Sequence, residues 1–216
     1  MLGGLALGLL LGLKHAAEPD HLVAVSTMVG RTRGTRRGAV LGALWGLGHC
    51  AALVSFGGAL ILTGTLVPPA AAAGLELAVS LMLIGLGARS LGRAAGREPP
   101  PRPLTLAAGA SATTDPSHRV VLVGLVHGLA GTGMPTALAV ARWPSARFQV
   151  LYIALYGVGA AGAMTLASGL AGASLRRQSG GQVRRAVDAA AGLASLVCGV
   201  AWAAGSLGDL VWLDKV

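Results

Sequence analysis

Residues 14–21 read KHAAEPDH and lie in the middle of an otherwise apolar stretch that covers roughly residues 2–29. A charged residue at the centre of a membrane helix costs ~2.5–3.5 kcal/mol on insertion scales. Lys14, Glu18 and Asp20 would together cost roughly 8–10 kcal/mol if all three faced lipid without partners. We therefore expect these side chains to face a cavity, to pair with one another, or to bind an ion.

The composition of the whole chain indicates that its solvent is a bilayer. Of 216 residues, 54% are hydrophobic and only 12% are charged, whereas soluble domains carry about 25% charged residues. Such a chain cannot bury its apolar surface internally and still present a charged coat. Its 34 glycines favour close packing of helices in lipid. These features exclude an ordinary cytosolic enzyme and a disordered chain.

Six apolar stretches are each long enough to cross a hydrocarbon core of ~30 Å as a helix. They cover residues 2–29, 38–62, 72–91, 120–141, 148–170 and 186–212. Thirteen of the seventeen Lys and Arg residues lie in the gaps after the first, third and fifth stretches or, in the case of Arg89, at the end of the third stretch, without interleaved aromatics. Cytoplasmic loops carry such an excess. We predict a multi-pass protein of the plasma (inner) membrane, with both termini outside, an uncleaved first span and no nucleic-acid partner.

The two halves of the chain resemble each other. The segment GLKH at 12–15 matches GLVH at 124–127, and ALWGLG at 43–48 matches ALYGVG at 154–159. Glu76 and Asp188 stand in the same register as the first match, and each opens the last span of its half. The matches follow the same order in both halves, which indicates an internal repeat.

This repeat predicts an all-α fold of six transmembrane helices. We expect two three-helix repeats, residues 1–92 and 120–216, joined by a Pro-rich cytoplasmic linker at 93–119. Because three is an odd number, the repeats would insert with opposite orientations. Inverted repeats are a transporter architecture in which the substrate site lies near the midplane, where the repeats meet.

The polar segment of the first span carries donors for a metal ion. His15, Asp20 and His21 offer two imidazoles and a carboxylate, with Glu18 as a further carboxylate. Imidazole suits nickel, cobalt, copper and zinc. On a regular helix the two histidines would point about 120° apart, but Pro19 lacks an N–H and crowds the preceding turn. We expect the helix to break there and the donors to converge on a polar cavity, as at transporter ion sites.

Two further histidines lie inside apolar spans. His49 follows Gly-Leu-Gly in the second span, and His127 in the fourth span is the repeat counterpart of His15. A single buried histidine is commonly a hydrogen-bonded structural residue. Because these histidines form a set beside glycines, we expect both to face the cavity of the first span as metal ligands.

In these histidine-containing motifs the chain resembles the nickel/cobalt transporter family. His15-x4-Asp20-His21 resembles the first signature of that family, and the string GLKHAAEPDHL resembles its short six-helix branch of urease-accessory-type or high-affinity nickel permeases. Gly48-His49 and the HGLAG segment that begins at His127 resemble its motifs in the second and fourth helices. The resemblance implies that His15, Asp20, His21 and His49 recognise the metal. Glu18, Pro19 and Cys50 depart from the pattern of the larger relatives.

Two enzymatic or redox alternatives stay open. His15-x4-Asp20 alone matches an acyltransferase pattern in which histidine is the base, but the chain has no domain to carry it and adds His21. A thiol–disulfide carrier would need paired membrane cysteines, whereas Cys50 and Cys198 occupy positions that are not repeat-equivalent.

We therefore predict a transporter rather than an enzyme, one that takes up nickel or cobalt. Efflux of these ions and transport of zinc or manganese are the alternatives. The metal is expected as the transported substrate, with no resident cofactor. The expected partners are the metal ion and the bilayer, and a homo-oligomer and a cytoplasmic metal chaperone stay open as further partners.

Overall fold

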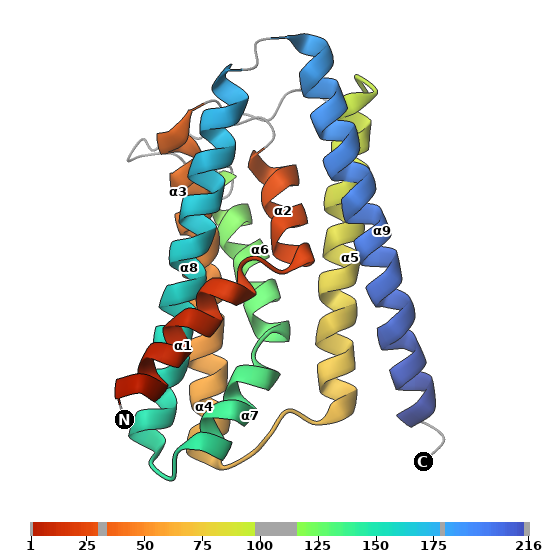
Figure 1. Ribbon diagram of the computed structural model, residues 1–216. Coiled ribbons are helices and arrows are strands. Elements are labelled where there is room, and N and C mark those ends of the chain that lie inside the picture. The colour runs from red at the N-terminus through yellow and green to blue at the C-terminus, as the bar shows by residue number, and fades with distance from the viewer. Residues whose placement is uncertain (1, 30–33, 98–115, 178–179, 214–216) are drawn as a thin grey trace.

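The computed structural model describes residues 2–29, 34–97, 116–177 and 180–213, and regular structure within them is helical (Figure 1). The helices before the Pro-rich segment are α1 (Leu2–His15), α2 (Pro19–Val29), α3 (Thr35–Ala52), the π-helix η1 (Leu53–Gly57), α4 (Gly58–Thr63) and α5 (Pro69–Ala94). Those after it are α6 (Pro116–Ala130), α7 (Gly133–Arg142), α8 (Ala146–Arg177) and α9 (Gly181–Leu213). The all-α prediction is confirmed.

Within these residues, four continuous helical segments are long and apolar enough to cross a bilayer. They are Thr35–Thr63, Pro69–Ala94, Ala146–Leu175 and Gly181–Trp212. A fifth candidate is the pair His118–Ala130 and Gly133–Arg142, which bends by 50° at a short break. The apolar helix Gly3–His15 is shorter, because the first predicted span is divided between α1 and α2.

The first apolar stretch breaks next to Pro19, as expected. α1 ends at His15 and α2 begins at Pro19, a position where the missing proline N–H is not needed by the helix. The amides of Ala17 and Glu18 close the intervening turn by donating to the carbonyls of Lys14 and His15, at 2.9 and 3.0 Å. At 1.5 Å per residue, α1 and α2 are about 21 and 16 Å long, so each reaches only part of the way through a bilayer. They meet in the middle of the molecule (Figure 1).

Glycines let the helices around this break approach closely. A methyl group on Gly12 of α1 would collide with the carbonyl oxygen of Tyr156 on α8. A methyl group on Gly124 of α6 would collide in the same way with the carbonyl oxygen of Trp45 on α3. The two glycines open the matched segments GLKH and GLVH, and the two aromatic residues hold the same place in ALWGLG and ALYGVG. The α1–α8 and α3–α6 contacts therefore use equivalent residues of the two halves.

A second pair of contacts repeats this relation. Gly159 of α8 lies against the Leu9 carbonyl of α1, and Gly48 of α3 lies against the Val121 carbonyl of α6. These glycines end the matched segments ALYGVG and ALWGLG, and Leu9 and Val121 each lie one helical turn before the glycine of the first contact. On the other side of the molecule α5 packs along α9, and α2 lies between this pair and the group formed by α3, α6 and α8 (Figure 1).

Helices occupy both ends of the segment predicted as a linker. α5 continues to Ala94, and α6 starts at Pro116. His118, which the sequence places in the linker, is exposed near the start of α6. Residues 98–115, with the prolines that predicted the linker, lie outside the described part of the chain.

Candidate metal centre

Four histidines and one aspartate converge where the broken helices meet. His15 ends α1, Asp20 and His21 open α2, His49 lies on α3, and His127 lies near the end of α6. All five side chains are buried, and His21 and His49 are fully buried. Without the break at residues 16–18, a regular helix would point His15 and His21 about 120° apart.

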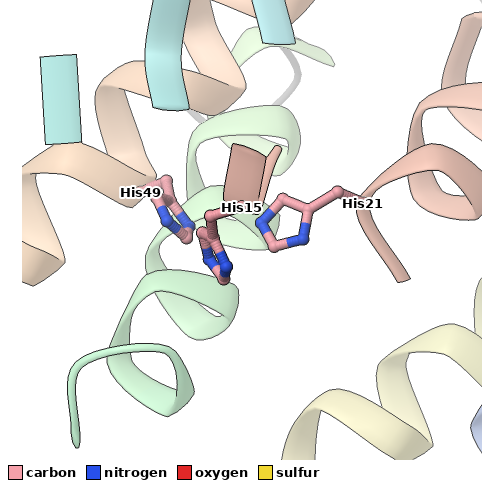
Figure 2. A group of neighbouring side chains, drawn as sticks. All are labelled: His15, His21 and His49. Carbon is pink, nitrogen blue, oxygen red and sulfur yellow. The ribbon is translucent and has the colours of Figure 1, made fainter. Parts of the chain in front are cut away.

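The imidazole rings lie close enough to share a ligand. The ring centroids of His15 and His21 are 4.4 Å apart, and that of His49 lies 5.4 and 5.3 Å from them. Figure 2 shows these three rings side by side, supplied by different helices. The His127 centroid lies 4.1 Å from that of His21 and 6.0 Å from that of His49.

Carboxylates contact three of the rings. Oδ2 of Asp20 lies 2.6 Å from Nε2 of His127, and Oε2 of Glu18 lies 2.8 Å from Nδ1 of His15. Oδ1 of Asp20 lies 3.1 Å from Nδ1 of His21, an ion-pair distance without hydrogen-bond geometry. A carboxylate beside an imidazole fixes the ring orientation and leaves the other ring nitrogen for a ligand.

Most ring nitrogens in the cluster lack a hydrogen bond. Among the described residues no hydrogen bond is formed by Nε2 of His15, by either nitrogen of His21 and His49, or by Nδ1 of His127. Oδ1 of Asp20 is also without one. A buried polar atom left unsatisfied costs about 1–3 kcal/mol. Six such nitrogens in one place therefore indicate a site arranged for a ligand rather than for internal hydrogen bonding.

The donors form two overlapping groups. His15, His21 and His49 each offer a ligand atom within 4.8 Å of the others, and so do Asp20, His21 and His127. His21 belongs to both groups. Nitrogen donors with one or two carboxylate oxygens suit nickel, cobalt, zinc and copper, whereas magnesium and calcium prefer oxygen alone. All six residues singled out in the sequence lie here, with Glu18 as the partner of His15.

One side of the cluster opens into a cavity of about 250 Å³. Its lining includes His15, Glu18, Asp20, His127, Glu76 of α5 and Trp202 of α9. Of the donors expected to face a common cavity, His21 and His49 do not line it. They lie within ring contact of His15, on the side of the cluster away from the cavity lining.

Comparison with curated proteins identifies a relative of this chain. The chain is 32% identical over 163 residues to the urease accessory protein UreH of Bacillus sp. (strain TB-90), and the match covers 74% of this chain and 72% of that protein. The chain belongs to the UreH family. No family model matches it, and no solved structure matches it. The resemblance to the urease-accessory-type branch of the nickel/cobalt transporters is thereby confirmed.

Family membership also bears on two broader predictions. The relative is named as a urease accessory protein rather than as an enzyme, in agreement with the prediction that this chain is not an enzyme. Its helices of membrane-spanning length make it a multi-pass membrane protein.

In this UreH-family chain, the sequence analysis did not predict the aromatic residues that surround the histidine cluster. Trp45 packs against His21 and His127, with ring centroids 5.5 and 5.8 Å apart, and Tyr156 packs against His15 at 5.5 Å. Trp45 and Tyr156 occupy equivalent positions in the matched segments ALWGLG and ALYGVG. The sequence signal that could have revealed them is an aromatic residue at the same position of both matched segments. Each packs against one of the two histidines, His15 and His127, that end the matched segments GLKH and GLVH.

Cys50 lies beside His49 in sequence but packs elsewhere. Its Sγ lies against Gly157 of α8, where an added methyl group would come within 2.7 Å of the sulfur. It is absent from both groups of metal donors. Lys14 is exposed, so its charge also stays outside the cluster.

Proposed function

We propose that this chain carries a divalent transition-metal ion across the plasma membrane, with nickel as the first candidate, cobalt as the second, and uptake as the direction. The six ring nitrogens without a hydrogen bond at the meeting point of the broken helices carry this proposal. Their donor chemistry suits these ions. The name of the relative, a urease accessory protein, supports delivery of the metal toward urease.

The ligand set follows from the free donor atoms. His15 would bind through Nε2, because its Nδ1 is held by Glu18. His21 and His49 complete the first donor group. Carboxylate–histidine pairs of this kind orient metal ligands in proteins.

Asp20 would act on both sides of the cluster. Its Oδ2 is engaged by His127, whereas Oδ1 has no hydrogen bond among the described residues and is the oxygen available to the ion. Since His21 belongs to both donor groups, an ion held by it can exchange between His49 and the Asp20–His127 side without leaving the cluster.

For the architecture, we infer six spans arranged as two inverted three-helix repeats. In this arrangement α1 with α2 forms the first span, and α6 with α7 forms the fourth. The paired glycine contacts at equivalent positions of the two halves support it. So does the position of the two breaks, since residues 16–18 of the first correspond to residues 128–130, which directly precede the second break at residues 131–132. The arginine-rich gaps then face the cytoplasm, which places both termini outside.

Uptake into proteoliposomes tests the function. The purified full-length chain should produce saturable nickel uptake that cobalt competes for strongly and manganese weakly. Parallel runs with an imposed proton gradient of either sign, and with metal preloaded inside, separate uptake from efflux. Empty liposomes give the background. If none of nickel, cobalt, zinc and manganese moves faster than in empty liposomes, the proposal fails.

A further inference from the structure

We propose that Glu76 of α5 belongs to a separate capture site, which takes up the divalent cation in hydrated form before it reaches the histidines. This inference rests on the proposed metal transport and adds a second binding step to it. The ligand class is a hydrated divalent cation held by carboxylate oxygens.

The cavity beside the histidine cluster has a strongly acidic lining. It contains the carboxylates of Glu18, Asp20 and Glu76, and no lysine or arginine of the described residues contributes to it. A cavity lined by one sign of charge and bounded by apolar walls raises the local concentration of counter-ions. Its volume of about 250 Å³ is several times the ~30 Å³ that a water molecule occupies in the liquid, so an ion can enter with water still bound.

Buried donor atoms without hydrogen bonds connect this cavity to the histidine site. Oδ1 of Asp20, Nε2 of His15 and Nδ1 of His127 belong to lining residues, and none of them has a hydrogen bond within the described chain. These residues are 4%, 8% and 2% exposed. The cavity therefore ends on donor atoms that are ready to replace the water ligands of an incoming ion.

Glu76 forms no salt bridge with a cation in the part of the chain that the structure describes. It is exposed on α5, about 10 Å along the helix from Pro69, and its carboxylate is 3.5 Å from the hydroxyl of Ser206 on α9. That neutral hydroxyl leaves the charge of the carboxylate uncompensated. A carboxylate within a membrane span is expensive unless it faces water or an ion.

Its repeat counterpart is neutralised. Asp188 of α9 is 4% exposed, and its Oδ1 lies 3.4 Å from the Arg93 guanidinium. Arg93 also donates to the Thr27 carbonyl of α2 at 3.1 Å, so this acid forms part of a structural tie between α9, α5 and α2. The same α5–α9 pair thus carries one acid that is used in packing and one that faces the cavity.

The functional step expected of Glu76 is capture rather than tight binding. A single carboxylate beside Glu18 holds a hydrated ion through charge attraction and bound water, and releases it readily. The imidazoles then displace water and bind the ion more tightly, since nickel and cobalt favour nitrogen over oxygen donors. Glu76 should therefore govern the metal concentration at half-maximal uptake, and the histidines should govern equilibrium affinity.

The test compares Glu76→Gln, Glu76→Asp and Asp209→Asn in proteoliposomes. Asp209 is an exposed acid on α9 outside the cavity lining, so its variant removes the same charge elsewhere. Initial nickel uptake is measured against nickel concentration at low and high ionic strength. In parallel, equilibrium nickel binding to each purified variant is titrated calorimetrically in detergent, with size-exclusion profiles to verify folding.

We expect Glu76→Gln to raise the KM for nickel about tenfold, at the lower end of electrostatic steering effects. In Glu76→Gln the maximal rate and the equilibrium Kd should stay near wild type, and KM should depend less on ionic strength. In Glu76→Asp, which keeps the charge, KM should stay close to the wild-type value. If Glu76→Gln has the same KM as Asp209→Asn, the capture site is refuted, whereas the proposed metal transport still stands. A Kd weakened as much as the KM would also overturn it, by making Glu76 part of the histidine site. Failure of the wild-type chain to bind or move nickel would instead refute the proposed function.

Discussion

The two helix breaks share a frame but differ in the donors they carry. His15 and His127 occupy equivalent positions in the matched segments GLKH and GLVH. At the positions equivalent to Asp20 and His21, the second break has Thr132 and Gly133. The Thr132 hydroxyl, in the turn between α6 and α7, donates to the Gly128 carbonyl in the last turn of α6 at 2.6 Å. The first break therefore supplies most of the chemistry, whereas the second supplies one imidazole and space.

The small residue at the second break makes room for the His15 ring. Gly131, the counterpart of Pro19, lies against the His15 ring, and an added methyl group would come within 3.4 Å of Nε2. That nitrogen is one of the unpartnered donors. Both matched segments are thus followed by a helix break, with the candidate ligands concentrated at the first break and space for them at the second.

The largest effect should come from the histidine shared by both donor groups. His21→Ala should lower nickel uptake at low metal by on the order of 100-fold or more, beyond the 10–100-fold typical of outer-shell changes. Gly133→Ala is the matched control at the equivalent position, where no atom lies within 4 Å of an added methyl group. Uptake is measured in proteoliposomes with equal protein content. Similar loss in both variants would contradict the division of roles between the breaks.

Asp20→Asn should give the next largest effect. The amide preserves size but removes the charge that faces His21 and His127, so nickel affinity should fall by about 10–100-fold. Thr132→Ser, at the equivalent position of the second break, should change affinity little. Calorimetric titration of purified variants with nickel measures both. Unchanged affinity in Asp20→Asn would remove Asp20 from the site.

Much of this arrangement could be predicted from the sequence, and the rest depended on packing. The break followed from Pro19, and convergence of the polar residues followed from the cost of exposing them to lipid. The pairing of Asp20 with His127 could not be predicted, because it joins helices that are far apart in sequence. Glu76 resembled Asp188 in sequence, and only the α5–α9 packing shows that Arg93 neutralises one of them.

Acidification should lower the apparent nickel affinity by a smaller factor than these substitutions. Imidazole binds metal only when neutral, and a free histidine has a pKa near 6.5. Between pH 7.5 and 5.5, proton competition can weaken the apparent affinity by at most about tenfold for each imidazole ligand of ordinary pKa. Apparent affinity should therefore fall as pH falls, and high nickel should restore uptake. The measurement is initial uptake against nickel at several pH values with the membrane potential clamped; affinity that is constant or improves on acidification would argue against histidine ligands.

The smallest effect is expected at Cys50, which packs against α8 rather than the cluster. Cys50→Ser should keep uptake within about twofold of wild type, since replacements away from a site cause small changes. His49→Ala, one residue earlier, should lose most uptake because it removes a ligand. Equal losses in the two variants would make the thiol a ligand and revise the donor set.

The ligation of bound nickel tests the central claim most directly. X-ray absorption spectroscopy of the purified chain loaded with one equivalent of nickel reports the donor atoms and the multiple scattering that marks imidazole. We predict two or three imidazole nitrogens with the remaining positions occupied by oxygen, and loss of imidazole scattering in a His15→Ala/His21→Ala/His49→Ala variant. A spectrum of wild-type chain with oxygen or sulfur ligands and no imidazole would contradict the account.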